Sequence, residues 1–280
     1  MGRIAYVNGR FVAHARARVH IEDRGYQFAD GVYEVCAVRG GTLLDEGLHW
    51  RRLERSLGEL AIELPVTIPA LKIIGRELLR RNRVENALLY VQVTRGVAPR
   101  DHAFPDARPA IVMTVKPMDH AKTIERAKAG VGVRTMPDLR WKRCDIKSVA
   151  LLPNVLAKQA ARCSGAFEAW LVDEQGCVTE GSSSNAWIVS NDGSIITRHL
   201  DHAILPGITR LRLVEIAAER QLKIVERAFT VREAQEAREA FLTSAGTFVM
   251  PVVEIDGQKI ATGRPGEIAS ALREAYLGTH

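Results

Sequence analysis

A polar interruption at residues 116–123, with Pro117 inside it, divides this 280-residue sequence into two parts. On both sides of it, short runs rich in β-branched residues alternate with segments of helical periodicity. A chain of this length can form two domains, each with its own core. We therefore expect a mixed protein, α+β or α/β, with a smaller N-terminal domain over residues 1–118 and a larger C-terminal domain over residues 119–280.

Turn signals and periodicity predict the elements within each part. Asn8-Gly9 closes a hairpin over residues 3–13, and Asp256-Gly257 closes another before Ile260. Thr230 and Glu233 have the spacing of a capping box. Further helices are expected at 46–60, 67–82, 207–220, from about 152 and from about 265, with extended chain at 26–38 and strands at 87–93, 110–115, 130–136, 168–172, 177–180, 185–189, 194–197 and 241–244.

Composition excludes several classes of protein. A hydrophobic content of 46% with 26% charged residues is typical of a soluble globular chain, and no apolar run is long enough to span a membrane. The N-terminus has no signal-peptide pattern, so we expect a cytoplasmic protein. The net charge of +6 is spread along the chain without a nucleic-acid-binding motif, which favours anionic small molecules as ligands. The four cysteines lie far apart, and His199 and His202 have no carboxylate or cysteine cluster beside them, so neither a disulfide framework nor a metal site is expected.

Lys147 is the residue with the strongest claim to chemistry. It lies between a run that alternates basic and apolar residues and a segment of helical periodicity. A lysine amine becomes a nucleophile toward an aldehyde when burial or a nearby cation lowers its pKa. Arg140, Lys142 and Arg143 are the cations nearest to it in the sequence.

The sequence motifs around and after Lys147 resemble those of a known family. Arg-Cys-Asp-Ile-Lys-Ser at 143–148 is followed by Thr-Glu-Gly-Ser-Ser-Ser-Asn at 179–185 and by Leu-Pro-Gly-Ile-Thr-Arg at 205–210. Residues 24–35, 94–102 and 242–244 agree with the same pattern. Together they resemble the fold-type IV pyridoxal-phosphate enzymes, and within them the D-amino acid aminotransferases most of all.

The resemblance implies a cofactor site. Lys147 would carry pyridoxal 5′-phosphate, and Glu180 would keep the pyridine nitrogen protonated so that the ring can accept electrons. The phosphate would be bound by the N-terminus of the helix that begins near Gly207, because its amide groups and dipole favour a dianion. The remaining cofactor residues that the resemblance implies are Arg52, Leu205, Ile208, Thr209, Ser244 and Ala245. Ala245 departs from the family pattern, where a hydroxyl residue is common.

The resemblance also implies a substrate site and a dimer. Tyr33, Arg100 and His102 would clasp the substrate's α-carboxylate, with Val35 beside them. The loop with Arg100 and His102 would come from the partner subunit of a homodimer. A loop arginine paired with Asp101 or Asp106 is the purely structural alternative for Arg100.

The expected activity is ping-pong transamination from a D-amino acid, such as D-alanine or D-glutamate, to 2-oxoglutarate or pyruvate. Alternatives of the same fold are a branched-chain L-amino acid aminotransferase, an (R)-amine transaminase and an aminodeoxychorismate lyase. A basic binding protein without catalytic activity is the alternative from another class.

Overall fold

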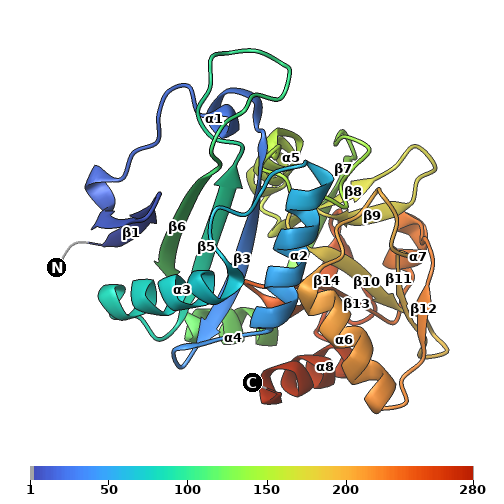
Figure 1. Cartoon of the computed structure of the whole chain (residues 1–280). Helices are drawn as coiled ribbons and strands as arrows, with labels where there is room; N and C mark the ends of the chain where they lie inside the picture. The colour runs from blue at the N-terminus through green and yellow to red at the C-terminus, as the bar shows by residue number, and fades with distance from the viewer. Residues whose placement is uncertain (1–2, 280) are drawn as a thin grey trace. The chain divides into compact units, whose positions relative to one another are not determined.

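The computed structural model describes residues 3–279, which form two compact units (Figure 1). The first comprises residues 3–119 together with Ile146–Ala150, and the second comprises His120–Asp145 together with residues 151–279. The first boundary lies one residue after the expected one. The position of Lys147 differs more, because the structure places its segment in the smaller unit and not in the larger one.

The first unit is built on a six-stranded antiparallel sheet of order β2-β1-β6-β5-β3-β4. The Asn8-Gly9 hairpin is confirmed, since β1 and β2 pair across it. The elements of this unit are β1 (Ile4–Val7), β2 (Arg10–Ala13), a 3-10 turn (His14–Arg16), α1 (Arg24–Phe28), β3 (Gly31–Arg39), β4 (Thr42–Leu43), α2 (Glu46–Glu59), α3 (Ile68–Asn82), β5 (Ala87–Thr94) and β6 (Ala110–Pro117).

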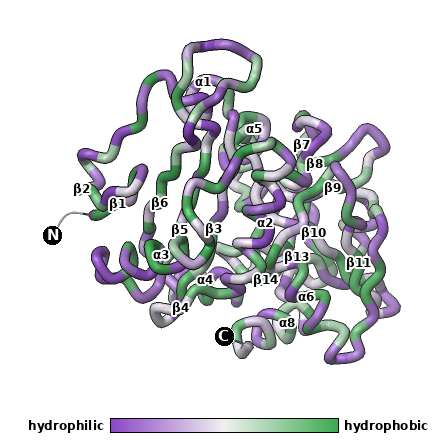
Figure 2. The backbone as a smooth tube through the Cα atoms, viewed as in Figure 1, coloured by the Kyte–Doolittle hydropathy of each residue, from purple (hydrophilic) through white to green (hydrophobic). Residues whose placement is uncertain are grey.

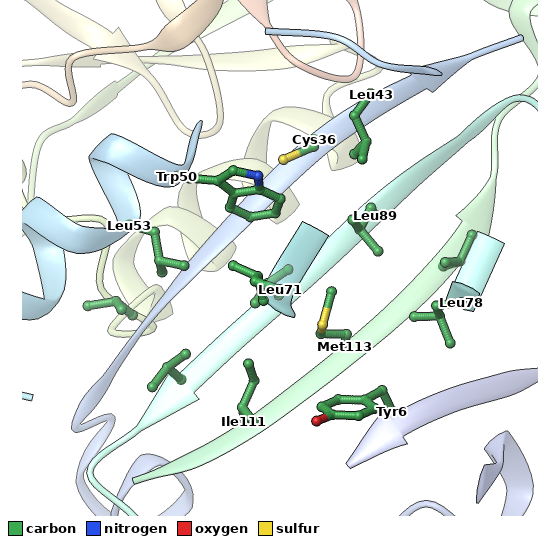
Figure 3. Packing of buried hydrophobic residues seen from close by; sticks show 14 of the residues in the cluster. Tyr6, Cys36, Leu43, Trp50, Leu53, Leu71, Leu78, Leu89, Ile111 and Met113 are labelled. Carbon is green, nitrogen blue, oxygen red and sulfur yellow. The ribbon is translucent and has the colours of Figure 1, made fainter. Parts of the chain in front are cut away.

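Helices α2 and α3 supply the apolar cover of this sheet. Figure 3 shows Trp50 and Leu53 of α2 and Leu71 of α3 packed with Leu89 and other strand residues in one core. Because side chains alternate along a strand, every second residue of β3, β5 and β6 points into this core. The intervening residues of β3, among them Tyr33 and Val35, lie on the other face of the strand. Neighbouring positions of β3 therefore face either the core or the opposite side of the sheet.

The second unit is built on a curled sheet of nine strands with parallel and antiparallel pairs, in which β12-β11-β10-β13-β14-β7-β8-β9 follow one another and β15 pairs with β14. The expected capping box is present, with Thr230 and Glu233 bonded reciprocally. The elements are α4 (His120–Ala129), β7 (Val131–Pro137), α5 (Leu152–Cys163), β8 (Glu168–Val172), β9 (Val178–Gly181), β10 (Asn185–Val189), β11 (Ile195–Thr197), α6 (Ile208–Glu219), β12 (Ile224–Glu226), α7 (Val231–Gln235), β13 (Glu239–Ser244), β14 (Phe248–Ile255), β15 (Gln258–Lys259) and α8 (Glu267–Gly278).

Figure 2 shows hydrophobic stretches along the strands of each unit, whereas the loop between β5 and β6 is largely hydrophilic. The core of the second unit contains residues of seven of its strands together with residues of α4 and α7, and the Trp170 and Phe229 rings pack edge to face in it.

None of the helices within residues 3–279 combines the length and the apolarity needed to cross a membrane.

Candidate active site

Lys147 is held by its own backbone against β3. Its carbonyl accepts a hydrogen bond from the Tyr33 amide at 3.0 Å, and the Val149 amide donates to Gly31 at 3.0 Å. Its amide donates to the Ser56 hydroxyl of α2 at 3.2 Å. The Lys147 side chain is half-buried, with Nζ 4.3 Å from the centroid of the Tyr33 ring. The backbone of residues 147–149 is therefore fixed at three points, while the Lys147 amine lies over Tyr33, the predicted substrate residue.

Tyr33 and Val35 lie on the face of β3 opposite the helices, in alternation with the buried Glu34. The Tyr33 ring lies 5.7 Å from that of Tyr90, its neighbour on β5. Burial, and then the charge of Tyr33, raise the pKa of Tyr90 to about 12, so its hydroxyl stays protonated and donates to Gln92 at 2.6 Å. The two tyrosine rings thus form an aromatic surface, and the amine of Lys147 lies over its Tyr33 ring.

Arg52 has a carboxylate partner that the sequence did not reveal. Its Nε and Nη2 donate to the two oxygens of Glu34 at 2.7 and 2.9 Å. His49 Nδ1 lies 2.7 Å from Glu34 Oε2. Burial alone would raise the pKa of Glu34, but the charge and hydrogen bonds of Arg52, with a contribution from His49, lower it to about 2. Burial lowers the pKa of His49, so a neutral ring donates from Nδ1. The phosphate contact expected of Arg52 stays a prediction.

In the second unit, Glu180 is the centre of a polar cluster. Arg140 Nη1 donates to its Oε1, and Asn185 Nδ2 and the Leu205 amide donate to its Oε2 at 3.0 and 3.1 Å. Arg140 also binds Asp138 with Nε at 2.9 Å and Nη2 at 2.7 Å. Burial would lower the pKa of Arg140, but Asp138 and Glu180 raise it, so the guanidinium remains charged beside Glu180.

The helix α6 begins beside this cluster. Its N-cap Gly207 offers no side-chain cap, and no acidic residue lies in its first turn. A Cβ at Gly207 would lie 2.0 Å from Asn185 Oδ1, so only glycine fits here without displacing that amide. Ile208 and Thr209 follow and are buried, and the Thr209 hydroxyl has no hydrogen-bond partner within residues 3–279. Amide groups and a hydroxyl are therefore available to an anion at this end of the helix.

The turn between β13 and β14 carries Ser244 and Ala245 in front of a buried cation. The hydroxyls of Ser244 and Thr247 lie 2.8 Å apart across it. Arg273 of α8 donates from Nη1 to the carbonyls of Thr247 at 2.7 Å and Val249 at 2.5 Å. Burial lowers its pKa to about 10, and within the described chain it has no carboxylate partner and its Nη2 has no acceptor. A turn backed by an uncompensated cation suits a phosphate.

The run Ser182–Ser184 has a structural task. All three hydroxyls donate to the carboxylate of Glu168, which is buried and also lies 3.0 Å from Lys158 Nζ. These serines hold the bend between β9 and β10, so they set the positions of Glu180 and Asn185 at its two ends.

The structure brings the predicted residues together in two groups. One group, in the first unit, joins Lys147 with Tyr33, and Val35 lies on the same face of β3 as Tyr33. The other group, in the second unit, joins the Glu180 carboxylate with the Leu205 amide. Arg100 and His102 are exposed, and no hydrogen bond, ion pair or ring contact in residues 3–279 connects either of them to Tyr33. Arg100 likewise has no described bond to Asp101 or Asp106, contrary to the purely structural alternative.

The comparisons decide the family. The model of amino-transferase class IV matches residues 31–255. A D-alanine aminotransferase of Staphylococcus haemolyticus is 39% identical over 274 residues, which cover 97% of this chain and 95% of that protein. The chain belongs to the class IV aminotransferases. Another relative, the D-alanine aminotransferase of Bacillus licheniformis, is 41% identical over 269 residues, or 96% of this chain and 94% of that protein.

The fold of this aminotransferase is that of solved relatives. The branched-chain amino acid aminotransferase of Escherichia coli superposes with a TM-score of 0.91 at 21% identity, covering 99% of this chain and 94% of the other. The fold-type IV architecture with two units is therefore confirmed. Enzymes of class IV use pyridoxal phosphate, and this aminotransferase is one of them. In the second unit, the uncapped start of α6 and the uncompensated Arg273 suit the phosphate of that cofactor. In the first unit, the half-buried Lys147 offers an amine to its aldehyde.

The sequence did not single out several residues of this site. Glu34, His49 and Ser56 lie in segments that read only as strand and helix, and their partners are distant in sequence. Arg140 was considered as a neighbour of Lys147, but its guanidinium is bound to Asp138 and Glu180. Asn185 could have been found, since it ends the motif that contains Glu180.

Proposed function

We propose that this enzyme transfers the amino group of a D-amino acid, such as D-alanine or D-glutamate, to 2-oxoglutarate or pyruvate by a ping-pong mechanism. The observation that carries the proposal is the similarity of about 40% identity, over nearly the whole chain, to proteins named D-alanine aminotransferase. The branched-chain aminotransferases that share the fold are 24% identical or less among those compared, so they support the alternative less well.

When bound, pyridoxal phosphate supplies an aldehyde that takes up the amino group and a ring that accepts electrons from Cα. Lys147 would hold the cofactor through Nζ, and the amine, once released from the cofactor, would move the Cα proton of the substrate. Glu180, fixed by Arg140 and Asn185, would accept a hydrogen bond from the protonated ring nitrogen of the bound cofactor. The start of α6, the turn at Ser244 and Ala245, and Arg52 would hold the phosphate.

A substrate assay tests the proposal. D-alanine, L-leucine and (R)-1-phenylethylamine are each supplied with 2-oxoglutarate, and the oxo product is followed. We expect pyruvate from D-alanine at a rate at least about tenfold above either competitor, because only D-alanine presents a carboxylate on the side that the clasp serves. Branched-chain oxo acid from L-leucine would reject the proposal. Pyruvate from aminodeoxychorismate without an oxo-acid acceptor would indicate the lyase instead.

We further propose a homodimer in which the loop with Arg100 and His102 completes the neighbouring site. The support is the exposure of both residues without any described contact to Tyr33. Helix α5 also leaves three large apolar side chains in solvent, which favours a covering surface: Leu152 at 68%, Val155 at 58% and Leu156 at 62% exposure.

Mixing two impaired variants tests this dimer. Arg100→Ala lacks the clasp and Lys147→Ala lacks the amine, so a mixed dimer regains one intact site if the loop acts across subunits. After random exchange of equal amounts, about half of the dimers are mixed and each has one intact site of two. The mixture should therefore regain about a quarter of the activity of the same amount of wild-type enzyme. The control mixes Lys147→Ala with the double variant, which regains nothing. Mixed dimers seen by mass spectrometry without recovered activity would contradict the proposal.

We also place the enzyme in the cytoplasm. The four cysteines are free thiols, and unpaired thiols are typical of a reducing compartment. Fractionation of the producing cell, with antibody detection, tests this location.

A further inference from the structure

The loop that joins β5 and β6, residues 95–109, is attached to the first unit mainly at its beginning. The Arg24 amide donates to Gly96 at 2.9 Å, and the Ala98 amide donates to Glu22 at 3.4 Å. From residue 99 to residue 107, no backbone hydrogen bond to the rest of the described chain is present. The part of the loop that carries Arg100 and His102 therefore needs another means of fixation.

Arg24 provides it. Arg24 is 3% exposed and lies in α1, which Figure 1 shows beside this loop. Its Nη1 donates to the Asp101 carbonyl at 2.5 Å, and its Nη2 donates to the His102 carbonyl at 3.4 Å. Among residues 3–279 these are the only hydrogen bonds that reach residues 99–107 from outside the loop. One guanidinium thus binds the backbone of His102 and of the residue after Arg100.

The guanidinium of Arg24 is itself held in place. Its Nε donates to Asp30 at 2.8 Å, and Arg95 binds the same carboxylate with Nε at 2.7 Å and Nη2 at 3.1 Å. Arg95 also donates to the carbonyls of Leu60 and Ala61 at the end of α2. Burial would raise the pKa of Asp30, but the hydrogen bonds of Arg95 and Arg24 lower it. The support therefore runs from α2 through Arg95 and Asp30 to Arg24 and the loop.

Phe28 orients the side chains that the loop presents. It lies four residues after Arg24, one turn along α1, so both residues occupy the same side of this short helix. The Arg100 guanidinium lies 4.7 Å from the centre of the Phe28 ring, and the His102 ring lies 5.4 Å from it. The Arg24 guanidinium lies 4.9 Å from the same ring. One aromatic ring therefore contacts both members of the predicted carboxylate clasp.

We propose that Arg24, with Phe28, is a positioning residue that determines how tightly the enzyme holds the substrate carboxylate. Arg24 fixes the loop backbone at residues 101 and 102, and Phe28 holds Arg100 and His102 in the orientation in which they meet the carboxylate. Neither residue touches the substrate. The proposal rests on the proposed function in so far as Arg100 and His102 clasp a carboxylate.

A double-mutant cycle separates positioning from a general effect on folding. Arg24→Lys keeps the charge but loses the planar fork that reaches two carbonyls at once. For this variant we expect kcat/KM for D-alanine to fall about 10-fold, mainly through KM, while the cofactor absorbance band and cofactor affinity are unchanged. In an Arg100→Ala background the same substitution should change kcat/KM less than about twofold, because the residue that it positions is gone.

Amide hydrogen exchange completes the test. Amide hydrogen exchange without substrate should accelerate over residues 99–107 in Arg24→Lys and Phe28→Leu, and not in the control Arg51→Lys, whose side chain is exposed on α2. Unchanged exchange, or effects of Arg24→Lys and Arg100→Ala that simply add, would overturn the proposal. If the wild-type enzyme prefers an L-amino acid, D-specificity has failed, and the cycle is run with that amino acid, since it bears the same carboxylate.

Discussion

Replacing Lys147 by alanine is expected to lower kcat for transamination by at least about 10⁴-fold, because the variant loses both the tether of the cofactor and the base that moves the Cα proton. The fold should survive this change. Three hydrogen bonds hold residues 147–149 to Gly31, Tyr33 and Ser56, and all three use main-chain atoms of this segment. The melting temperature of the apoenzyme should therefore change little.

Steady-state and single-turnover rates with D-alanine measure the loss. Lys142→Ala is the matched control, because Lys142 is an exposed lysine of the preceding loop, and its kcat should stay within about twofold of the wild type. Reduction of the wild-type holoenzyme with borohydride, followed by digestion, should label the peptide that contains Lys147. More than about 1% of the activity in Lys147→Ala, or a label on another peptide, would contradict the assignment.

Glu34→Gln is expected to destabilise the protein by about 3 kcal/mol at neutral pH, since it removes the carboxylate charge that pairs with the buried cation of Arg52. The carboxylate has a lowered pKa of about 2 in the folded protein, against 4.5 for an ordinary glutamate. Its contribution is therefore fully present above about pH 4.5 and is lost as the pH falls toward about 2. The lowered pKa of His49 adds to the acid lability, because the unfolded chain takes up that proton first.

Urea unfolding at a series of pH values measures this effect. The free-energy difference between wild type and Glu34→Gln should be largest near neutral pH and should shrink below about pH 4. Glu77→Gln is the control. Glu77 also has a pKa lowered to about 2, through Arg80 and Arg81, but it lies on the surface, where solvent screens such pairs, and its replacement should change stability little. Equal stability of wild type and Glu34→Gln at pH 7 would refute the role of this pair.

Periodicity predicted the elements that bury one apolar face. The helices α2, α3, α6 and α8 and both hairpins were confirmed within one or two residues at most ends. Helix α4 was missed because only Thr123 and Ala127 of it are buried, so its sequence looks like a polar linker. The five residues of α1 are too few to show a helical period, so the sequence predicts extended chain from residue 26, where the structure has the end of this helix. In α5 the helix was expected, but the residues that it buries are Ala157 and Ala161 and not its larger side chains.

The residues of the candidate site likewise fall into those that the sequence reveals and those that only the fold reveals. Lys147, Glu180 and Gly207 stand in short motifs, so the order of residues alone was enough to select them. The partners that fix them come from elsewhere in the sequence. Glu34 looks like any polar residue in a strand until α2 is placed over that strand, and Arg24 acquires its role only when residues 101 and 102 fold back onto α1.

The five-residue segment that carries Lys147 leaves the second unit at Asp145 and re-enters it at Leu151. The chain therefore passes between the units three times. A gene fragment ending at codon 119 would encode the smaller unit without Lys147, the residue predicted to bind the cofactor, and without the residues that pair with Gly31 and Tyr33. Exchanging the smaller unit for that of a homologue, to transplant substrate preference, thus requires two separate inserts, of which the second is only five codons long.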